Sequence, residues 1–245
     1  MRILIQILLL FIVLLIPAPS YGLRDEGALY CNAEIIQKPV ISGKTRDDLS
    51  RQYISKHYGF SVKTPHIEPK LIVVHWTAME GLDASYKAFR NIRLPGSRTE
   101  LVRGGELNVG THFLVDKEGA IYQLLPLPYF ARHVIGLNYY SIGIENVGGT
   151  AGKLTPQQEE ADEMLIRCLI DRYKGIRHVI GHYEYRELEG TPLFLEQDPK
   201  YRTEKTDPGR AFMHKIRSRL SDLYKESVLC SIKQNKEGKC LKTYQ

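Results

Sequence analysis

The amino-acid sequence predicts a single α/β domain, and two observations support that prediction. Short apolar runs of strand length alternate with segments whose apolar residues recur at helical spacing, which is typical of chains that combine both elements around one sheet. The chain has 245 residues, of which 43% are hydrophobic and 25% are charged. A chain of this length can bury most of its apolar surface in one core, so a second domain is not required.

The N-terminal segment, residues 1–22, predicts export. Arg2 supplies a positive charge, residues 3–16 are apolar at all but one position, and prolines then end the run. This pattern is typical of a secretory signal peptide, because the run is shorter than the ~20 residues that cross a bilayer. Small residues allow cleavage after Gly22 or after Ser20, and an uncleaved anchor is the alternative. We therefore expect a periplasmic or secreted protein without a stable membrane span after cleavage.

The remainder divides into an N-terminal arm (23–67), a main domain (68–224) and a basic tail (225–245). The arm is polar and rich in tyrosine, and we expect one helix around 46–58. The β-branched run at 71–74 is typical of a strand buried on both faces, and it ends at His75. The other predicted elements are a helix at 82–90, a hairpin with strands at 112–115 and 120–124, a strand at 141–147, a helix at 155–174, a strand at 176–180 and a final helix from Pro208.

Two helix starts carry specific signals. Thr155 can cap a helix, Pro156 fits its first turn, and Gln158 can complete a capping box. Pro208 is expected in the first turn of the final helix, directly after Asp207.

Four cysteines, Cys31, Cys168, Cys230 and Cys240, allow three disulfide pairings in an exported chain. Cys230 and Cys240 bracket a short polar loop, so we favour that bridge. The alternative is a buried free thiol, most plausibly Cys168 on the apolar face of a helix. No Cys-x-x-Cys pair occurs, which excludes a zinc ribbon and a thioredoxin-type centre.

The net charge of +6 predicts an anionic partner, which could be nucleic acid, a membrane surface or an acidic cell-envelope polymer. Export favours the last, and we expect no nucleic-acid partner. The glycine-rich stretch 148–154 resembles a phosphate loop, but it has three residues between its framing glycines instead of four, and Leu154 where a hydroxyl would hold magnesium. Nucleotide binding is therefore not predicted.

His75, His182 and Asp207 are candidate zinc ligands. Both histidines directly follow apolar strands, and the aspartate precedes Pro208. A catalytic zinc site needs three protein ligands with nitrogen or oxygen donors and an open fourth position, which this set can supply. Spacing alone leaves the alternative that each histidine is an ordinary structural residue.

Five segments carry a resemblance to the zinc-dependent N-acetylmuramoyl-L-alanine amidases of the type 2 family. That family is related in fold to T7-type amidases and to peptidoglycan recognition proteins, and the resemblance covers roughly residues 68–222. It implies a central mixed β-sheet flanked by helices. The segments are Val74-His75-Trp76-Thr77-Ala78, His112 to Leu124 with Gly119, Ser141-Ile142-Gly143-Ile144-Glu145, Ile180-Gly181-His182 and Lys205-Thr206-Asp207-Pro208-Gly209.

The resemblance also implies roles for single residues. His75, His182 and Asp207 would bind Zn²⁺, Glu145 would be the catalytic acid and base, and Lys205 would stabilise the oxyanion that develops in the transition state. The implied activity is hydrolysis of the amide bond between N-acetylmuramic acid and L-alanine in peptidoglycan, or in muropeptides derived from it.

Three further residues are predicted to contact the substrate. His112 lies where the family often has a histidine near the pocket, and His133 lies where it usually has Trp-His-Ala-Gly, although this chain departs from that motif. Arg103 belongs to an arginine-rich loop that could bind substrate carboxylates. A surface role is the alternative for that loop, and a structural role is the alternative for His133.

The chain also departs from compact relatives in the length of residues 183–206, between the last histidine and the aspartate. We expect this insertion to cover one wall of the cleft; the alternative is a self-packed excursion far from the substrate. Two other functions stay open at this point. One is a non-catalytic peptidoglycan-binding module, and the other is a metalloprotease, which would lack the usual His-Glu-x-x-His signature.

Overall fold

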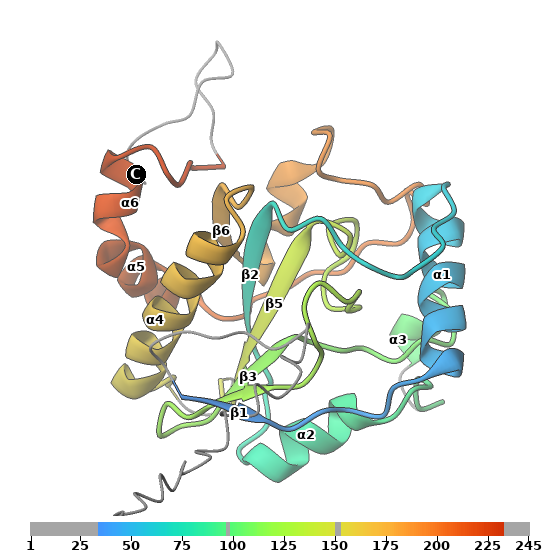
Figure 1. Ribbon diagram of the computed structural model, residues 1–245, viewed down its shortest axis with the longest axis horizontal. Helices are drawn as coiled ribbons and strands as arrows, with labels where there is room; N and C mark the ends of the chain where they lie inside the picture. The colour runs from blue at the N-terminus through green and yellow to red at the C-terminus, as the bar shows by residue number, and fades with distance from the viewer. Residues whose placement is uncertain (1–33, 97–98, 150–152, 233–245) are drawn as a thin grey trace, which may run out of the picture.

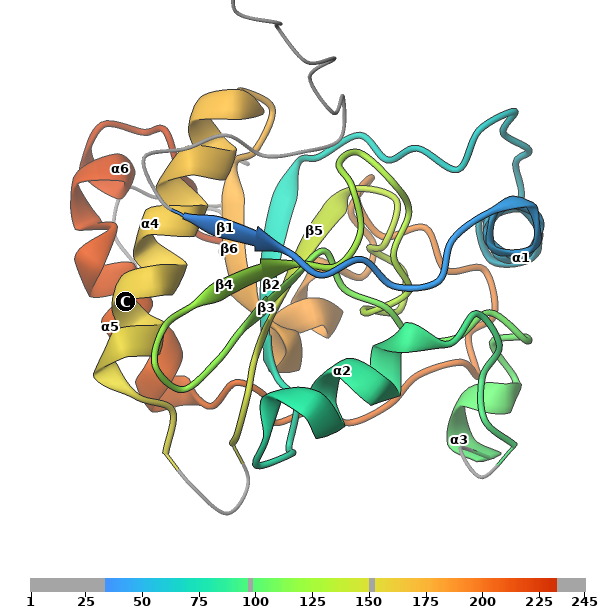
Figure 2. The same cartoon turned by 60° about the horizontal axis from the view of Figure 1, so that its bottom comes forward.

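A six-stranded mixed sheet with helices on both sides forms the domain (Figures 1 and 2). The computed structural model describes residues 34–96, 99–149 and 153–232. The predicted α/β class with a central mixed sheet is confirmed. The predicted signal peptide, most of the basic tail, Cys31 and Cys240 lie outside the described residues.

The strand order β1-β4-β3-β5-β2-β6 places β2 between β5 and β6. β2 pairs in parallel with both neighbours, β5 pairs in parallel with β3, and β3 forms the predicted antiparallel hairpin with β4. Parallel strands end at the same edge of a sheet, so the C-terminal ends of β5, β2 and β6 lie side by side. The strands are β1 (Ile35–Gln37), β2 (Leu71–Trp76), β3 (Phe113–Val115), β4 (Ile121–Gln123), β5 (Ser141–Asn146) and β6 (His178–Gly181).

The helices α4, α5 and α6 lie on one side of the sheet, and α1 and α2 lie on the other (Figures 1 and 2). The first five residues of β2 and all of β5 are buried, as expected for strands covered on both faces. The helical elements are α1 (Lys44–Tyr58), α2 (Leu82–Arg90), α3 (Thr99–Val102), α4 (Pro156–Arg172), the 3₁₀ helix η1 (His182–Leu188), α5 (Arg210–Arg219) and α6 (Ser221–Lys225).

The arm contributes more than one helix to the domain. Helix α1 occupies the expected place and buries Leu49, Tyr53 and Ile54 in the main core. The preceding strand β1 pairs in parallel with β4 at the sheet edge, which the sequence did not predict. Three residues are too few to establish a period, so only the pairing identifies this strand.

The two predicted helix starts have different outcomes. At α4, the Thr155 side chain accepts a hydrogen bond from the Gln158 amide and the capping box is complete, as predicted. The prediction that Pro208 occupies the first turn of the final helix is wrong. The Asp207–Pro208 peptide is cis, and α5 begins at Arg210 after Gly209, whose φ of 87° lies in the region that favours glycine.

Cys168 and Cys230 are both disulfide-bonded. The alternative of a free thiol at Cys168 is therefore wrong. The favoured Cys230–Cys240 bridge stays a prediction, because Cys240 lies outside the described residues.

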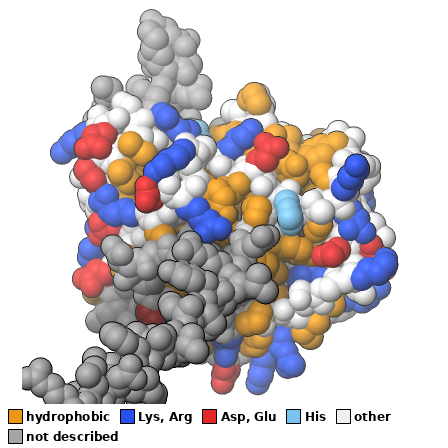
Figure 3. All heavy atoms as spheres, in the orientation of Figure 1, with side chains coloured by type: hydrophobic (Ala, Val, Ile, Leu, Met, Phe, Trp, Pro, Cys, Tyr) orange, Lys and Arg blue, Asp and Glu red, His pale blue; other side chains and the backbone are white. Residues whose placement is uncertain are grey.

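Acidic and basic side chains are interspersed over α4, α5 and α6 on the face that Figure 3 shows. Several of them form ion pairs, including Arg167 with Glu163 and Asp222. The positive net charge is therefore not concentrated over these helices. Within the described ranges, no helix is both long enough and apolar enough to span a membrane.

Candidate metal centre and pocket

Three neighbouring strands bring the central candidate residues together. His75 on β2 pairs in register with Glu145 on β5, so both side chains point to the same face of the sheet. On the other flank, Val74 pairs with Gly181, the last residue of β6, and His182 follows directly. The register therefore explains why residues far apart in the sequence meet at one sheet edge.

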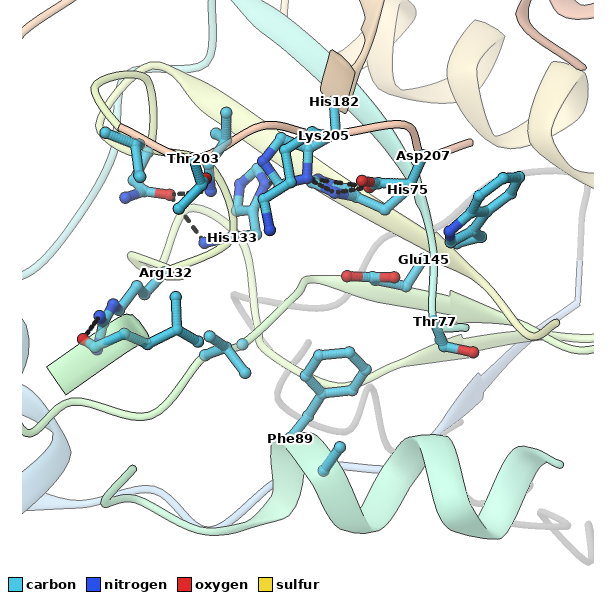
Figure 4. Close-up of a pocket in the computed structure, with 18 of the residues that line it drawn as sticks. His75, Thr77, Phe89, Arg132, His133, Glu145, His182, Thr203, Lys205 and Asp207 are labelled. Carbon is cyan, nitrogen blue, oxygen red and sulfur yellow. Dashed lines mark hydrogen bonds and ion pairs between the residues drawn. The ribbon is translucent and has the colours of Figure 1, made fainter. Parts of the chain in front are cut away.

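Asp207 completes a triangle with the two histidines (Figure 4). The Nδ1 atoms of His75 and His182 are 3.0 Å apart, and Asp207 Oδ2 lies 3.1 Å from the first and 3.0 Å from the second. Zinc bonds of about 2.0–2.2 Å at tetrahedral angles separate ligand atoms by about 3.3 Å. The donor atoms and their spacing thus fit a zinc ion, and the three predicted ligands form a metal-type cluster.

The electrostatic environment favours the protonation states that a metal needs. Burial lowers the pKa of His182 to about 4, although Asp207 opposes this shift. Burial by itself would raise the pKa of Asp207, but the charges and hydrogen bonds of both histidines hold that pKa well below its ordinary value. At neutral pH, His182 is therefore a neutral imidazole and Asp207 is a carboxylate, which are the forms that bind metal.

Glu145 and Lys205 flank this cluster in one pocket. Glu145 is 8% exposed on β5, and its carboxylate faces the same space as the cluster in Figure 4. Lys205 is half-buried, two residues before Asp207, and also lines the pocket. A carboxylate and an ammonium beside a three-ligand cluster can serve proton transfer and charge stabilisation, respectively.

The pocket extends from the metal cluster to a second wall, of which the sequence analysis predicted only the contribution of the insertion. This wall includes Tyr53 from α1, Arg132, and Tyr201 and Thr203 from the insertion. No sequence motif includes Tyr53, and Arg132 stands where the family pattern around His133 usually has Trp. The expected position of the insertion on one cleft wall agrees with Tyr201 and Thr203.

Arg132 is a buried cation held mainly by backbone oxygens. Its guanidinium donates hydrogen bonds to the carbonyls of Leu101 at 2.6 Å, Gly105 at 3.1 Å and Leu107, and to the Tyr201 hydroxyl at 3.0 Å. Carbonyl partners carry no net negative charge, so none of these hydrogen bonds pairs Arg132 with a carboxylate. Arg132 therefore brings a cationic side chain to this end of the pocket.

The residues predicted to contact substrate occupy three different environments. His112 is fully buried; its Nδ1 accepts from the Gly143 amide at 3.0 Å, and its Nε2 donates to the Tyr129 carbonyl at 2.8 Å. Arg103 is exposed and donates to the Lys200 carbonyl.

Neither His112 nor Arg103 is among the residues that line the pocket, and their predicted substrate contacts stay predictions. Both were selected from sequence neighbours, which do not reveal whether a side chain points into a core, a pocket or solvent. His133 does line the pocket, beside His75.

The arm and the insertion are joined by a second buried histidine and carboxylate. His57 on α1 contacts both oxygens of Glu196 through Nδ1, at 2.9 and 3.0 Å, and its Nε2 lies 3.2 Å from the Gly104 carbonyl. The Gln197 amide also donates to the His57 carbonyl. The insertion is therefore fastened to α1, which fixes the segment that carries Tyr201 to the pocket.

Comparisons with known proteins place this geometry in context. A model of the N-acetylmuramoyl-L-alanine amidase family matches residues 65–210, more than half of the chain. A selenomethionine derivative of AmpD is 24% identical with a TM-score of 0.50, and the match covers 81% of this chain and 99% of that one. The amidase LysC from Clostridium intestinale URNW is 20% identical with a TM-score of 0.47, covering 77% and 97%.

A human peptidoglycan recognition protein, PGRP-IBETAC in complex with glycosamyl muramyl pentapeptide, is 19% identical with a TM-score of 0.44, covering 63% and 86%. No curated protein matches the chain. At these identities, the similarity to AmpD shows a shared fold.

Proposed function

The chain belongs to the family of N-acetylmuramoyl-L-alanine amidases, and we propose that it is a zinc hydrolase that cleaves the amide bond between N-acetylmuramic acid and L-alanine. The observation that carries this proposal is the convergence of His75, His182 and Asp207, with ligand atoms 3.0–3.1 Å apart, beside Glu145 in an open pocket. Two imidazoles and one carboxylate are a common ligand set of catalytic zinc.

His75, His182 and Asp207 would hold the ion. When bound, zinc supplies Lewis-acid chemistry, which polarises a carbonyl and acidifies water at neutral pH. Two adjacent strands position His75 and His182, and the Asp207–Gly209 turn positions Asp207. A hydrogen bond from the Tyr183 amide to the Asp207 carbonyl, at 3.1 Å, joins this turn to the residue after His182. Little rearrangement is needed to bind the ion, because the ligand atoms already converge.

Glu145 acts as the base and then as the acid. Its carboxylate accepts a proton from the attacking water as the water oxygen bonds to the scissile carbonyl carbon. It then delivers that proton to the nitrogen of L-alanine as the carbon–nitrogen bond breaks. The products are the lactyl carboxylate of the sugar and a stem peptide with a free amine.

Lys205 stabilises the negative charge that develops on the carbonyl oxygen. Its ammonium lines the pocket two residues from Asp207 and donates hydrogen bonds that strengthen as that charge grows. Arg132 brings a cationic side chain to the opposite end of the pocket, which attracts a substrate that carries carboxylates. The two cations thus serve different steps, charge stabilisation and substrate attraction.

The site of action follows from the predicted export. Residues 1–22 have the pattern of a signal peptide, and peptidoglycan lies outside the cytoplasmic membrane. We propose action in the periplasm or after secretion, in cell-wall turnover, recycling or lysis.

The test is mass spectrometry of peptidoglycan fragments after incubation with residues 23–245. Wild type should release stem peptides with a free L-alanine amine, and a zinc chelator or His182→Ala should abolish that release. His214→Ala is the matched control, because His214 is exposed on α5 and does not line the pocket; this variant should behave as wild type. Intact fragments with folded, zinc-loaded wild type would contradict the proposal and favour a binding module. Cleavage within the peptide would indicate a protease.

A further inference from the structure

His75 has two ring nitrogens with different surroundings. Its Nδ1 faces His182 and Asp207, whereas its Nε2 lies 3.0 Å from Nδ1 of His133. The rings of His75 and His133 are nearly perpendicular, at 82°, with centroids 5.1 Å apart. His133 therefore contacts a candidate metal ligand on the side away from the metal position.

Neighbouring groups hold the backbone and the outer ring nitrogen of His133, and Gly143 leaves room for its ring. Its Nε2 lies 3.1 Å from the Ser141 hydroxyl at the start of β5. The Asn138 side chain accepts hydrogen bonds from the backbone amides of His133 and Val134, at 2.8 and 2.7 Å. A Cβ atom at Gly143 would approach His133 Nδ1 to 2.9 Å, so the ring occupies space that a side chain there would take. The hydrogen bonds thus hold the backbone and the outer ring nitrogen in place.

One arrangement of protons satisfies every contact. A metal bound through Nδ1 of His75 needs the lone pair of that atom, so the proton of His75 is on Nε2. Nε2–H can then donate only to an unprotonated Nδ1 of His133. The proton of His133 consequently lies on its own Nε2, from which it donates to Ser141.

We propose that His133 is a positioning residue that fixes the tautomer and ring orientation of His75, with Ser141 as the last member of the chain. This inference rests on the proposed metal site. It assigns His133 a role that differs from the substrate contact predicted from its place in the sequence. Outer hydrogen-bond partners of metal-binding histidines typically contribute 10–100-fold to metal affinity or activity, so an effect of about that size is expected.

His112 provides a control residue for His133 in the same part of the domain. Its ring lies 5.9 Å from that of His133 and is fully buried, but both of its nitrogens bond to backbone groups. Loss of either histidine leaves a gap in the same part of the domain. Only loss of His133 should change the metal site.

The experiment measures the zinc dissociation constant by competition with a chromophoric chelator. His133→Asn keeps an acceptor near the position of Nδ1, whereas His133→Leu has a similar shape without one. We expect His133→Leu to weaken zinc binding by about 10–100-fold and His133→Asn to stay close to wild type. His112→Leu should lower thermal stability without changing zinc affinity, and Ser141→Ala should give a smaller loss than His133→Leu.

Equal zinc affinity of His133→Leu and wild type would overturn the inference and leave the proposed function intact, whereas wild type that binds no zinc would overturn both. If His133→Leu does not fold, the tautomers in zinc-loaded wild type decide the matter. A long-range proton–nitrogen NMR spectrum should show the proton on Nε2 of both His75 and His133. A proton on Nδ1 of His133 would overturn the inference.

Discussion

The protein contains two buried pairs of histidine and carboxylate that differ in how hydrogen-bond partners are arranged around the histidine ring. At His57, each ring nitrogen faces acceptor oxygens, from Glu196 on one side and the Gly104 carbonyl on the other. At His182, the ring nitrogen and the Asp207 oxygen converge on a point that His75 also faces.

The first pair is closed, because each ring nitrogen faces its own acceptor, and the second set is open, because three potential ligand atoms face one another. Burial does not distinguish them, because the His57 and His182 side chains are 2% and 8% exposed. The arrangement of the partners does: each ring nitrogen of His57 faces its own acceptor, whereas two ring nitrogens and one carboxylate oxygen face one another in the second set, which suits a cation between them.

Replacement of the carboxylate in the open set should have the largest effect. Asp207→Asn removes the negative charge of a metal ligand and leaves the fold around it in place. We expect zinc affinity to fall by more than the ~100-fold that an outer partner can contribute, with loss of amidase activity. Chelator competition and peptide release measure both effects. Retention of zinc affinity by Asp207→Asn would contradict the assignment of the ligands.

The matched change in the closed pair should affect stability instead. Glu196→Gln removes the charge of the carboxylate that His57 Nδ1 contacts, and a hydrogen bond to a charged group contributes about 1.5–3 kcal/mol of unfolding free energy. We expect zinc affinity measured on the folded fraction to stay unchanged. Urea unfolding of Glu196→Gln and wild type checks the first expectation. A loss of zinc affinity without a loss of stability would remove the distinction between the two pairs.

A third buried carboxylate has no histidine beside it. Asp162 on α4 accepts a hydrogen bond from the Asn146 side chain at 2.9 Å, and burial raises its pKa to about 7. Between pH of about 4 and 7, the folded protein therefore keeps a proton that the unfolded chain releases. The contribution of Asp162 to stability is thus present at low pH and is lost as the pH rises through 7.

Asp162→Asn should remove this dependence, because the new amide does not titrate and its oxygen can still accept from Asn146. Relative to the variant, wild type should lose up to about 1 kcal/mol of unfolding free energy per pH unit in that window. Denaturant unfolding of both proteins from pH 4 to 8 gives the difference directly. If the unfolding free energies of the two proteins change in parallel with pH, Asp162 keeps an ordinary pKa.

The sequence could predict the open set but not the closed pair, for a physical reason. His75 and His182 directly follow apolar runs, and parallel pairing then brings strand ends together without knowledge of any loop. His57 and Glu196 meet only because the insertion folds back onto α1, and no periodicity records where an irregular segment runs. His112 shows the same limit, since its strand was predicted but the backbone groups that surround its ring were not.

Tyr201 contacts both the His57 pair and the pocket wall, and removal of its hydroxyl should have the smallest effect of these changes. Its ring lies 5.1 Å from that of His57, and its hydroxyl accepts from Arg132 in the pocket wall. Tyr201→Phe keeps the ring contact and removes only that hydrogen bond, which should cost about 1 kcal/mol of stability. Because Arg132 lies on the other side of the pocket from the cluster of His75, His182 and Asp207 (Figure 4), KM should rise while kcat and zinc affinity stay unchanged. Steady-state kinetics with a muramyl peptide test this. A fall in kcat at constant KM would mean that the wall takes part in the chemical step, and that the closed pair supports catalysis as well as stability.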